Sequence, residues 1–177
     1  LPDTGITSNQ CYAASSNAFV SCSSVSAIAL NDKQDGMLGR DVISPDSSDG
    51  LLGSNYRLVG AVGSSDCVKD EVTGKTWQRT SSTLVNFLPN PLLQEAYGIR
   101  DAANNAALCG YTDWTLPSPF DLQSLVNYGM VNSLAAIDGN WFAPKSGMYY
   151  TGIPFMGGSG RDTWMVDFKG GGVSIHT

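Results

Sequence analysis

The chain has 177 residues, 42% of them hydrophobic and 15% charged, which predicts one domain with a hydrophobic core and at most a small appendage. Its formal net charge is −6, and acids outnumber bases both in residues 1–100 (ten to seven) and in residues 101–177 (six to three), which argues against a nucleic-acid partner. The sequence contains no long apolar run, so we expect the protein not to be membrane-spanning.

The four cysteines predict disulfide bonds. No two of them have the C-x-x-C spacing of a redox or zinc site, and a single histidine leaves few ligands for a transition metal. Four cysteines allow three pairings. We favour Cys11–Cys22, which closes a short Ser-rich loop, and Cys67–Cys109, which ties the middle of the chain to the segment after residue 109. Paired cysteines indicate an oxidising compartment.

Residues 1–55 predict an N-terminal arm with a disulfide loop and a short acidic repeat. The pattern D-x-x-D-G-[ML]-L-G-x-[DN] occurs twice, fourteen residues apart. Clustered oxygen ligands could bind Ca²⁺, whereas Asp-Gly turns joining strands explain the same residues without a metal, and we favour the turns. The candidate calcium ligands are Asp32, Asp35, Asp41, Asp46, Asp49 and Asn55.

The next segment predicts strands and then helices. Residues 67–78 indicate a hairpin that turns at Thr73-Gly74. Asp70 and Glu71 are neighbours on a strand and would face opposite ways, so we interpret them as solvated turn charges and not as a catalytic pair. Further on, the sequence predicts one helix from residues 90–91 to Gly98 and a second over residues 99–108.

Residues 109–129 combine an aromatic turn with a well-marked helix start. Ser118 predicts an N-cap, Pro119 suits the first helical position, and Asp121 completes a capping box. Gly129 is placed to end this helix. Its apolar face would consist of Leu122, Leu125 and Val126.

Aromatic residues gather in the last part of the chain. Residues 164–168 alternate as a half-buried strand does, and a Gly-rich loop precedes them. Binding residues collect on loops that a rigid scaffold holds, so we expect a binding surface over residues 141–164. Its candidate residues are Lys145, Tyr150, Phe155, Arg161, Asp162 and Trp164.

Five motifs, in order, carry a family resemblance: CVKDEVTGKTW, CGYTDWTLPSPFDLQSLVNYG, IDGNWFAP, YYTG and TWMVDF. Together they resemble the Lcl C-terminal-domain family, named for a bacterial collagen-like adhesin. The resemblance implies an α+β, C-type-lectin-like fold, loop-rich and disulfide-stapled, with two helices packed on small antiparallel sheets. It also implies a secreted or surface-exposed bacterial protein that adheres through extracellular polysaccharide. The chain then divides into an arm, 1–55, and a lectin-type domain, 56–177.

The sequence departs from the family pattern at several positions. Thr115 stands where an Arg is usual, Asp121 where a Glu is usual, and Gly152 where a Ser is usual. The basic character of a binder of sulfated polymers is missing. At the end of the chain, residues 173–177 either form a short closing strand or leave a sheet edge that another subunit could complete.

These features lead to three hypotheses about function. The first is an adhesin-type binding module for an extracellular glycan or protein ligand, acting through loops 141–164. The alternative is a structural subunit of an extracellular fibre or coat that self-associates through the arm and a free sheet edge. An enzyme is least favoured, because G-x-S-x-G is absent and His176 lies near the end of the chain. We therefore expect no catalytic residues and no cofactor other than Ca²⁺.

Overall fold

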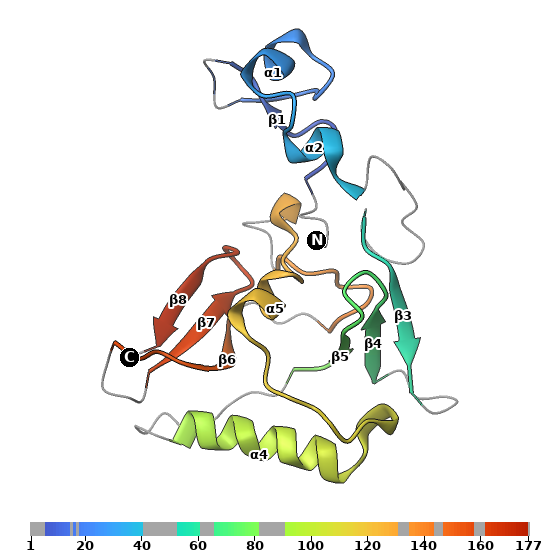
Figure 1. Cartoon of the computed structure of the whole chain (residues 1–177), viewed down its shortest axis with the longest axis vertical. Helices are drawn as coiled ribbons and strands as arrows, with labels where there is room; N and C mark the ends of the chain where they lie inside the picture. Colours follow the sequence, from blue (N-terminus) through green and yellow to red (C-terminus); the bar gives the residue numbers. More distant parts are fainter. Residues whose placement is uncertain are drawn as a thin grey trace.

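The computed structural model describes residues 6–14, 16, 18–40, 53–60, 66–81, 91–130, 135–143, 147–157 and 162–176. It confirms an α+β protein with small antiparallel sheets, few helices and two disulfides (Figure 1). The elements are, in chain order, β1 Cys11–Tyr12, β2 Phe19–Val20, α1 Val25–Leu30, α2 Asp35–Leu38, β3 Tyr56–Val59, β4 Cys67–Asp70, β5 Thr76–Gln78, α4 Pro91–Asn105, η1 Leu108–Gly110, α5 Pro119–Gln123, η2 Tyr128–Met130, β6 Met148–Pro154, β7 Thr163–Asp167 and β8 Val173–His176.

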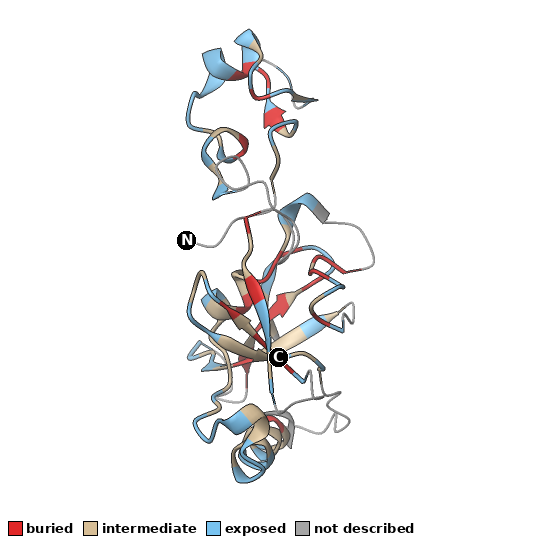
Figure 2. Ribbon diagram, turned by 90° about the vertical axis from the view of Figure 1, so that its right-hand side faces the viewer, coloured by how far each residue is buried: buried red, intermediate tan, exposed pale blue. Residues whose placement is uncertain are grey.

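The N-terminal arm projects from the body and has a very small core (Figure 1). β1 pairs with β2, and the Cys11–Cys22 disulfide confirms the predicted pairing. Only Cys11, Cys22 and Ala27 form its buried cluster. Most of the arm is therefore exposed, as Figure 2 shows.

The first Asp-Gly of the repeat does not join two strands. Asp35 and Gly36 open helix α2, so the turn interpretation is wrong for this copy. Close packing explains the glycine at this position, because Gly36 is buried so close to the Thr7 carbonyl that a Cβ there would clash with it. The Asp46 copy lies outside the described residues.

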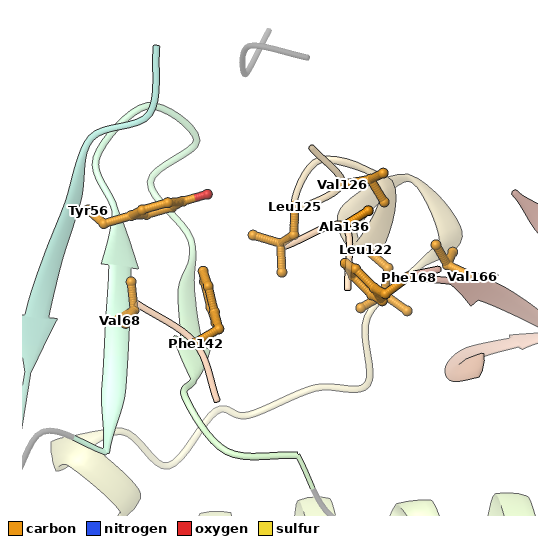
Figure 3. Packing of buried hydrophobic residues seen from close by; sticks show 9 residues of the cluster. All are labelled: Tyr56, Val68, Leu122, Leu125, Val126, Ala136, Phe142, Val166 and Phe168. Atoms are coloured by element: carbon orange, nitrogen blue, oxygen red, sulfur yellow. The ribbon is translucent and has the colours of Figure 1, made fainter. Parts of the chain in front are cut away.

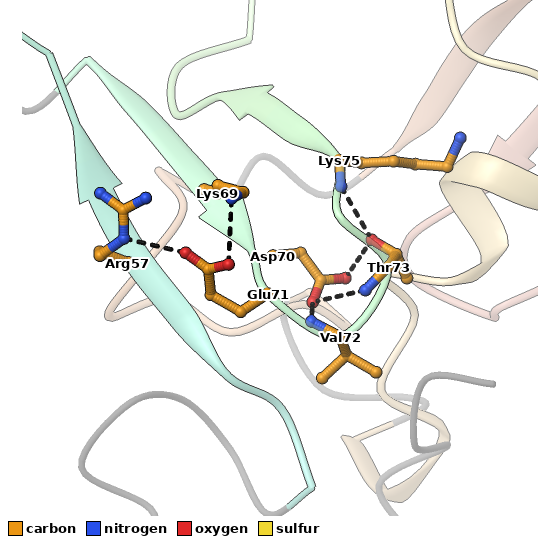
Figure 4. Close-up of polar contacts among 7 residues, drawn as sticks. All are labelled: Arg57, Lys69, Asp70, Glu71, Val72, Thr73 and Lys75. Atoms are coloured by element: carbon orange, nitrogen blue, oxygen red, sulfur yellow. Dashed lines mark hydrogen bonds and ion pairs between the residues drawn. The ribbon is translucent and has the colours of Figure 1, made fainter.

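The first body sheet has the order β3–β4–β5, and its hairpin turns where predicted, with Gly74 at φ 74°. Asp70 is not a solvated charge, because it is 3% exposed. Its carboxylate accepts hydrogen bonds from the Val72 and Thr73 amides and from the Thr73 hydroxyl, and so closes the turn (Figure 4). Glu71, which directly follows β4, points to the surface and pairs with Arg57 on β3 and with Lys69 on β4.

Helix α4 is one continuous helix where the sequence predicted two. It begins at Pro91 as expected, but it runs through Gly98 to Asn105. A glycine inside a helix costs only about 1 kcal/mol relative to alanine, which the continuing backbone hydrogen bonds tolerate. Two non-glycine residues with positive φ, Ala107 and Cys109, follow the helix and turn the chain away.

The capping box of α5 is confirmed, with Ser118 and Asp121 bonded reciprocally. The helix nevertheless ends at Gln123 and not at Gly129. Beyond Gln123 the amides of Leu125 and Val126 bond to carbonyls three residues back, which tightens the chain and turns both side chains into the core. Tertiary packing here overrides the glycine stop signal.

The second body sheet has the order β6–β7–β8. β8 pairs in register with β7, from Val166 opposite Val173 to Thr163 opposite His176. The closing strand is therefore present, and it forms one edge of the described sheet.

One hydrophobic core joins the two body sheets through α5, which packs against β6 and β7 (Figure 3). Its buried members come from both sheets, from α5 and from the segments around it. They are Tyr56, Val68, Leu122, Leu125, Val126, Ala136, Phe142, Val166 and Phe168. The Cys67–Cys109 disulfide, also as predicted, ties β4 to the turn after α4.

Replacing Asp70 with alanine should lower the free energy of unfolding by about 2–4 kcal/mol, because a buried carboxylate is lost and three partly buried donors lose their acceptor. Chemical denaturation of the oxidised protein measures this. Glu71→Ala is the matched control on the next, exposed residue and should change stability far less. Equal losses in the two variants would contradict the structural role of Asp70.

Tyr56 should make the fold sensitive to alkali. Burial raises its pKa from 10.0 to about 12; a Ser54 hydrogen bond opposes this, and Asp70 and Asp138 add to it. The unfolded chain thus loses this proton first. The stability that the neutral phenol confers is complete below pH 10 and is lost as pH rises toward 12.

At about pH 11 the loss should be about 1.4 kcal/mol relative to neutral pH. Denaturation curves of Tyr56→Phe should lack this component. An identical alkaline loss in the variant would show that other groups cause it.

Candidate binding site

A cavity of about 720 Å³ lies between helix α4 and the rest of the body. Its volume is in the range of small-molecule sites. Four segments bound it: the inner face of α4, strand β5, the aromatic turn at residues 111–117, and the first half of β6. The principal lining residues are Trp77, Ala96, Ile99, Ala103, Tyr111, Trp114, Leu116, Leu122, Leu125, Phe142, Tyr149, Tyr150 and Phe168.

The aromatic turn is held rigidly by local hydrogen bonds. The Asn104 side chain accepts from the Trp114 amide at 2.6 Å and donates to the Trp114 carbonyl at 3.1 Å. The Trp114 indole N–H donates to the Leu108 carbonyl, and the Tyr111 ring meets the Trp114 ring edge-on. Trp114 thus enters the cavity wall with both backbone and ring fixed, which lowers the ordering cost of binding.

The other end of the turn is attached to β6. The Gly152 amide donates to the Pro117 carbonyl at 2.9 Å. A Cβ on Gly152 would come within 2.8 Å of the Leu116 Cβ, which explains a glycine where the family pattern has a larger residue. This close approach brings Tyr150 to the same cavity as the turn.

The cavity floor is the hydrophobic core itself. Leu122, Leu125, Phe142 and Phe168 all line it, and each is less than 10% exposed. Trp77 forms part of the wall. Its indole nitrogen is the one buried side-chain nitrogen or oxygen without a hydrogen-bond partner in the part of the chain that the structure describes.

The charged groups at the cavity are largely engaged. Lys75 pairs with Asp121 at 2.8 Å, and Arg100 pairs with Asp101. Burial alone would raise the pKa of Asp121, but hydrogen bonds from Lys75 and from Ser118 outweigh it and lower the pKa. Asp121 is thus held as an anion beside its cation.

Arg79 and Tyr150 are two further polar residues in the lining. The Arg79 guanidinium donates to the carbonyls of Trp141 and Asn140. Burial raises the pKa of Tyr150, so its phenol stays neutral and can both donate and accept. With its ion pairs formed, the cavity suits a neutral ligand.

The candidate binding residues predicted from the sequence lie in different places. Tyr150 lines the cavity. Trp164 lies on the other face of its sheet, because Tyr150 pairs with Met165, the next residue along β7. Phe155 and Trp164 pack edge-on at 5.3 Å, and Asp162 is 7% exposed.

Lys145 and Arg161 lie outside the described residues, so the site on loops 141–164 stays a prediction. The sequence reasoning did not select Trp77, Tyr111 or Trp114. A sequence signal for two of them was present, because the aromatic residues Tyr111 and Trp114 lie three residues apart in the turn before Ser118.

The calcium hypothesis also stays a prediction. Asp32 and Asp35 are exposed on the arm, and the Asn55 carbonyl accepts the Glu71 amide. The structure does not describe Asp41, Asp46 or Asp49. Among the residues that it does describe, no cluster of three or more histidines, cysteines or carboxylates could hold a metal.

No helix in the described segments is long and apolar enough to cross a membrane. No curated protein and no solved structure matches the chain. The family model of the Lcl C-terminal domain, however, matches residues 66–177, which is more than half of the chain. This span runs from β4 to the end of β8, and it includes the Cys67–Cys109 disulfide and the aromatic turn. The chain therefore belongs to the Lcl C-terminal domain family.

Proposed function

We propose that the protein is an extracellular, adhesin-type binding module that recognises a saccharide unit of an extracellular polysaccharide. The observation that carries this is the cavity walled by aromatic rings, with Trp114 fixed by Asn104. Rings of tyrosine and tryptophan present apolar faces with polar tips, which suits the C–H faces and hydroxyls of a sugar. The family membership supports this role.

The electrostatics favour a neutral saccharide over a sulfated one. Two cations at the cavity are in ion pairs, Lys75 with Asp121 and Arg100 with Asp101, and a third, Arg79, donates to two backbone carbonyls. A sulfate would have to compete with these carboxylates, and the whole chain carries a net charge of −6. Both disulfides support an oxidising location outside the cytoplasm.

The proposal is binding without catalysis. Among the described residues that line the cavity there is no histidine and no cysteine, and all four cysteines are in disulfides. The buried carboxylate of Asp70 closes a turn, and that of Asp138 accepts the Asn140 amide. These groups serve the fold and are poor candidates for a general acid or base.

Binding to an array of neutral and sulfated bacterial polysaccharides, followed by titration of the best ligand, tests this. Tyr111→Ala should weaken binding at least about tenfold, because it removes a ring from the cavity wall. Tyr128→Ala is the matched control, because Tyr128 is 37% exposed against 36% for Tyr111 but lies outside the lining. It should leave the affinity unchanged.

Two results would contradict the proposal. One is the absence of binding to every glycan. The other is loss of binding in Phe155→Ala with none in Tyr111→Ala, which would place the site on the β6–β7 side instead.

A second candidate function is that of a structural subunit of an extracellular fibre. The observation that favours it is the apolar surface of the arm, whose core is too small to cover its own large side chains. Those at least 47% exposed are Tyr12, Phe19, Val25, Ile28, Leu30 and Leu38. Burying such a surface against a second copy would be favourable, and the edge strand β8 could accept a strand.

Sedimentation velocity over a range of concentrations tests the fibre hypothesis. The protein should form polymers, and the double variant Val25→Ser with Ile28→Ser should stay monomeric. The two positions lie in α1 and are 84% and 50% exposed, so the variant should still fold. A strictly monomeric native protein at all concentrations would contradict this function.

A further inference from the structure

The cavity has an apolar floor, and its wall contains a buried N–H donor that lacks an acceptor. The floor side chains Leu122, Leu125 and Phe142 come from the hydrophobic core and offer no hydrogen bonds. A sugar ring that carries only hydroxyls would leave some of them unpaired against this floor, which opposes binding. A ligand that fits both features needs an apolar group for the floor.

Trp77 supplies the second constraint. Its indole N–H has less than 1 Å² of accessible surface and no acceptor. Buried donors are nearly always paired, so an unpaired one calls for an explanation. Because Trp77 belongs to the cavity wall, a ligand in the cavity is the natural source of an acceptor for this N–H.

An acetamido group meets both constraints at once. Its methyl group is apolar and compact, and its amide carbonyl is a strong acceptor. It is also neutral, as the paired charges at the cavity require. The sugar ring would remain at the mouth, against Tyr111, Trp114 and Tyr150.

We propose that the cavity selects an N-acetylated sugar, with the acetamido methyl group on the core floor and the acetamido carbonyl accepting the Trp77 indole N–H. This inference rests on the proposed function, because it assigns a ligand class to the same site. It makes Trp77 a specificity-determining residue, which aligns the ligand without chemistry of its own.

Calorimetric titration with a matched pair of ligands tests the inference. The β-1,4-linked trisaccharides of N-acetylglucosamine and of glucose differ in the substituent at C2 of each ring. The native protein should bind the N-acetylated one about tenfold more tightly, as one buried hydrogen bond and one methyl group allow. Trp77→Phe should reduce this preference to about threefold or less.

Trp141→Phe is the matched control, because Trp141 also packs against the core but is not in the cavity wall. It should retain the full preference. Equal binding of both trisaccharides by the native protein would overturn the inference and leave the proposed function standing. No binding of either trisaccharide would overturn the inference alone, whereas no binding of any glycan on the array would overturn both.

A second measurement is read from the native protein. In the native protein, the Trp77 indole N–H resonance should move downfield and exchange more slowly on addition of the N-acetylated trisaccharide. The glucose trisaccharide should not cause this change. An unmoved Trp77 resonance at saturation would overturn the assigned hydrogen bond even if Trp77→Phe fails to fold.

Discussion

The structure depends above all on the double attachment of the chain after helix α4. The Cys67–Cys109 disulfide joins residues 42 positions apart in the sequence. By the loss of chain entropy it raises the free energy of the unfolded state by about 4 kcal/mol. Asn104 then fixes Trp114 through two hydrogen bonds to its backbone. Together these links hold α4 and the aromatic turn beside β4 and β5, which is what creates the cavity.

The cavity follows from this arrangement because α4 lines one side of it without filling the space. Its inner face carries small side chains, Ala96 and Ala103, and only Ile99 is larger among the apolar ones that line the cavity. The opposite wall is aromatic and fixed. A site of this kind favours recognition of a preformed ligand by shape.

Local signals predicted the parts of the fold that local physics determines. The capping box at Ser118 and the hairpin at Gly74 were correct because a side chain or a positive φ decides each within a few residues. Gly98 misled because the helical hydrogen bonds tolerate one glycine, and Gly129 misled because burial of Leu125 and Val126 ends α5 earlier. The cavity could not be predicted, since its walls come from segments that only the fold brings together. The sequence therefore indicated binding candidates in a loop and did not indicate Trp77.

The four indole N–H resonances test the central claim most directly. Trp77 and Trp114 line the cavity, whereas Trp141 and Trp164 do not. A ¹H–¹⁵N titration with the best polysaccharide fragment, with each resonance assigned by a Trp→Phe variant, reports all four positions in one experiment. The resonances of Trp77 and Trp114 should shift, and those of Trp141 and Trp164 should stay unchanged. A shift confined to Trp164 would contradict it and return the binding site to the loop before β7.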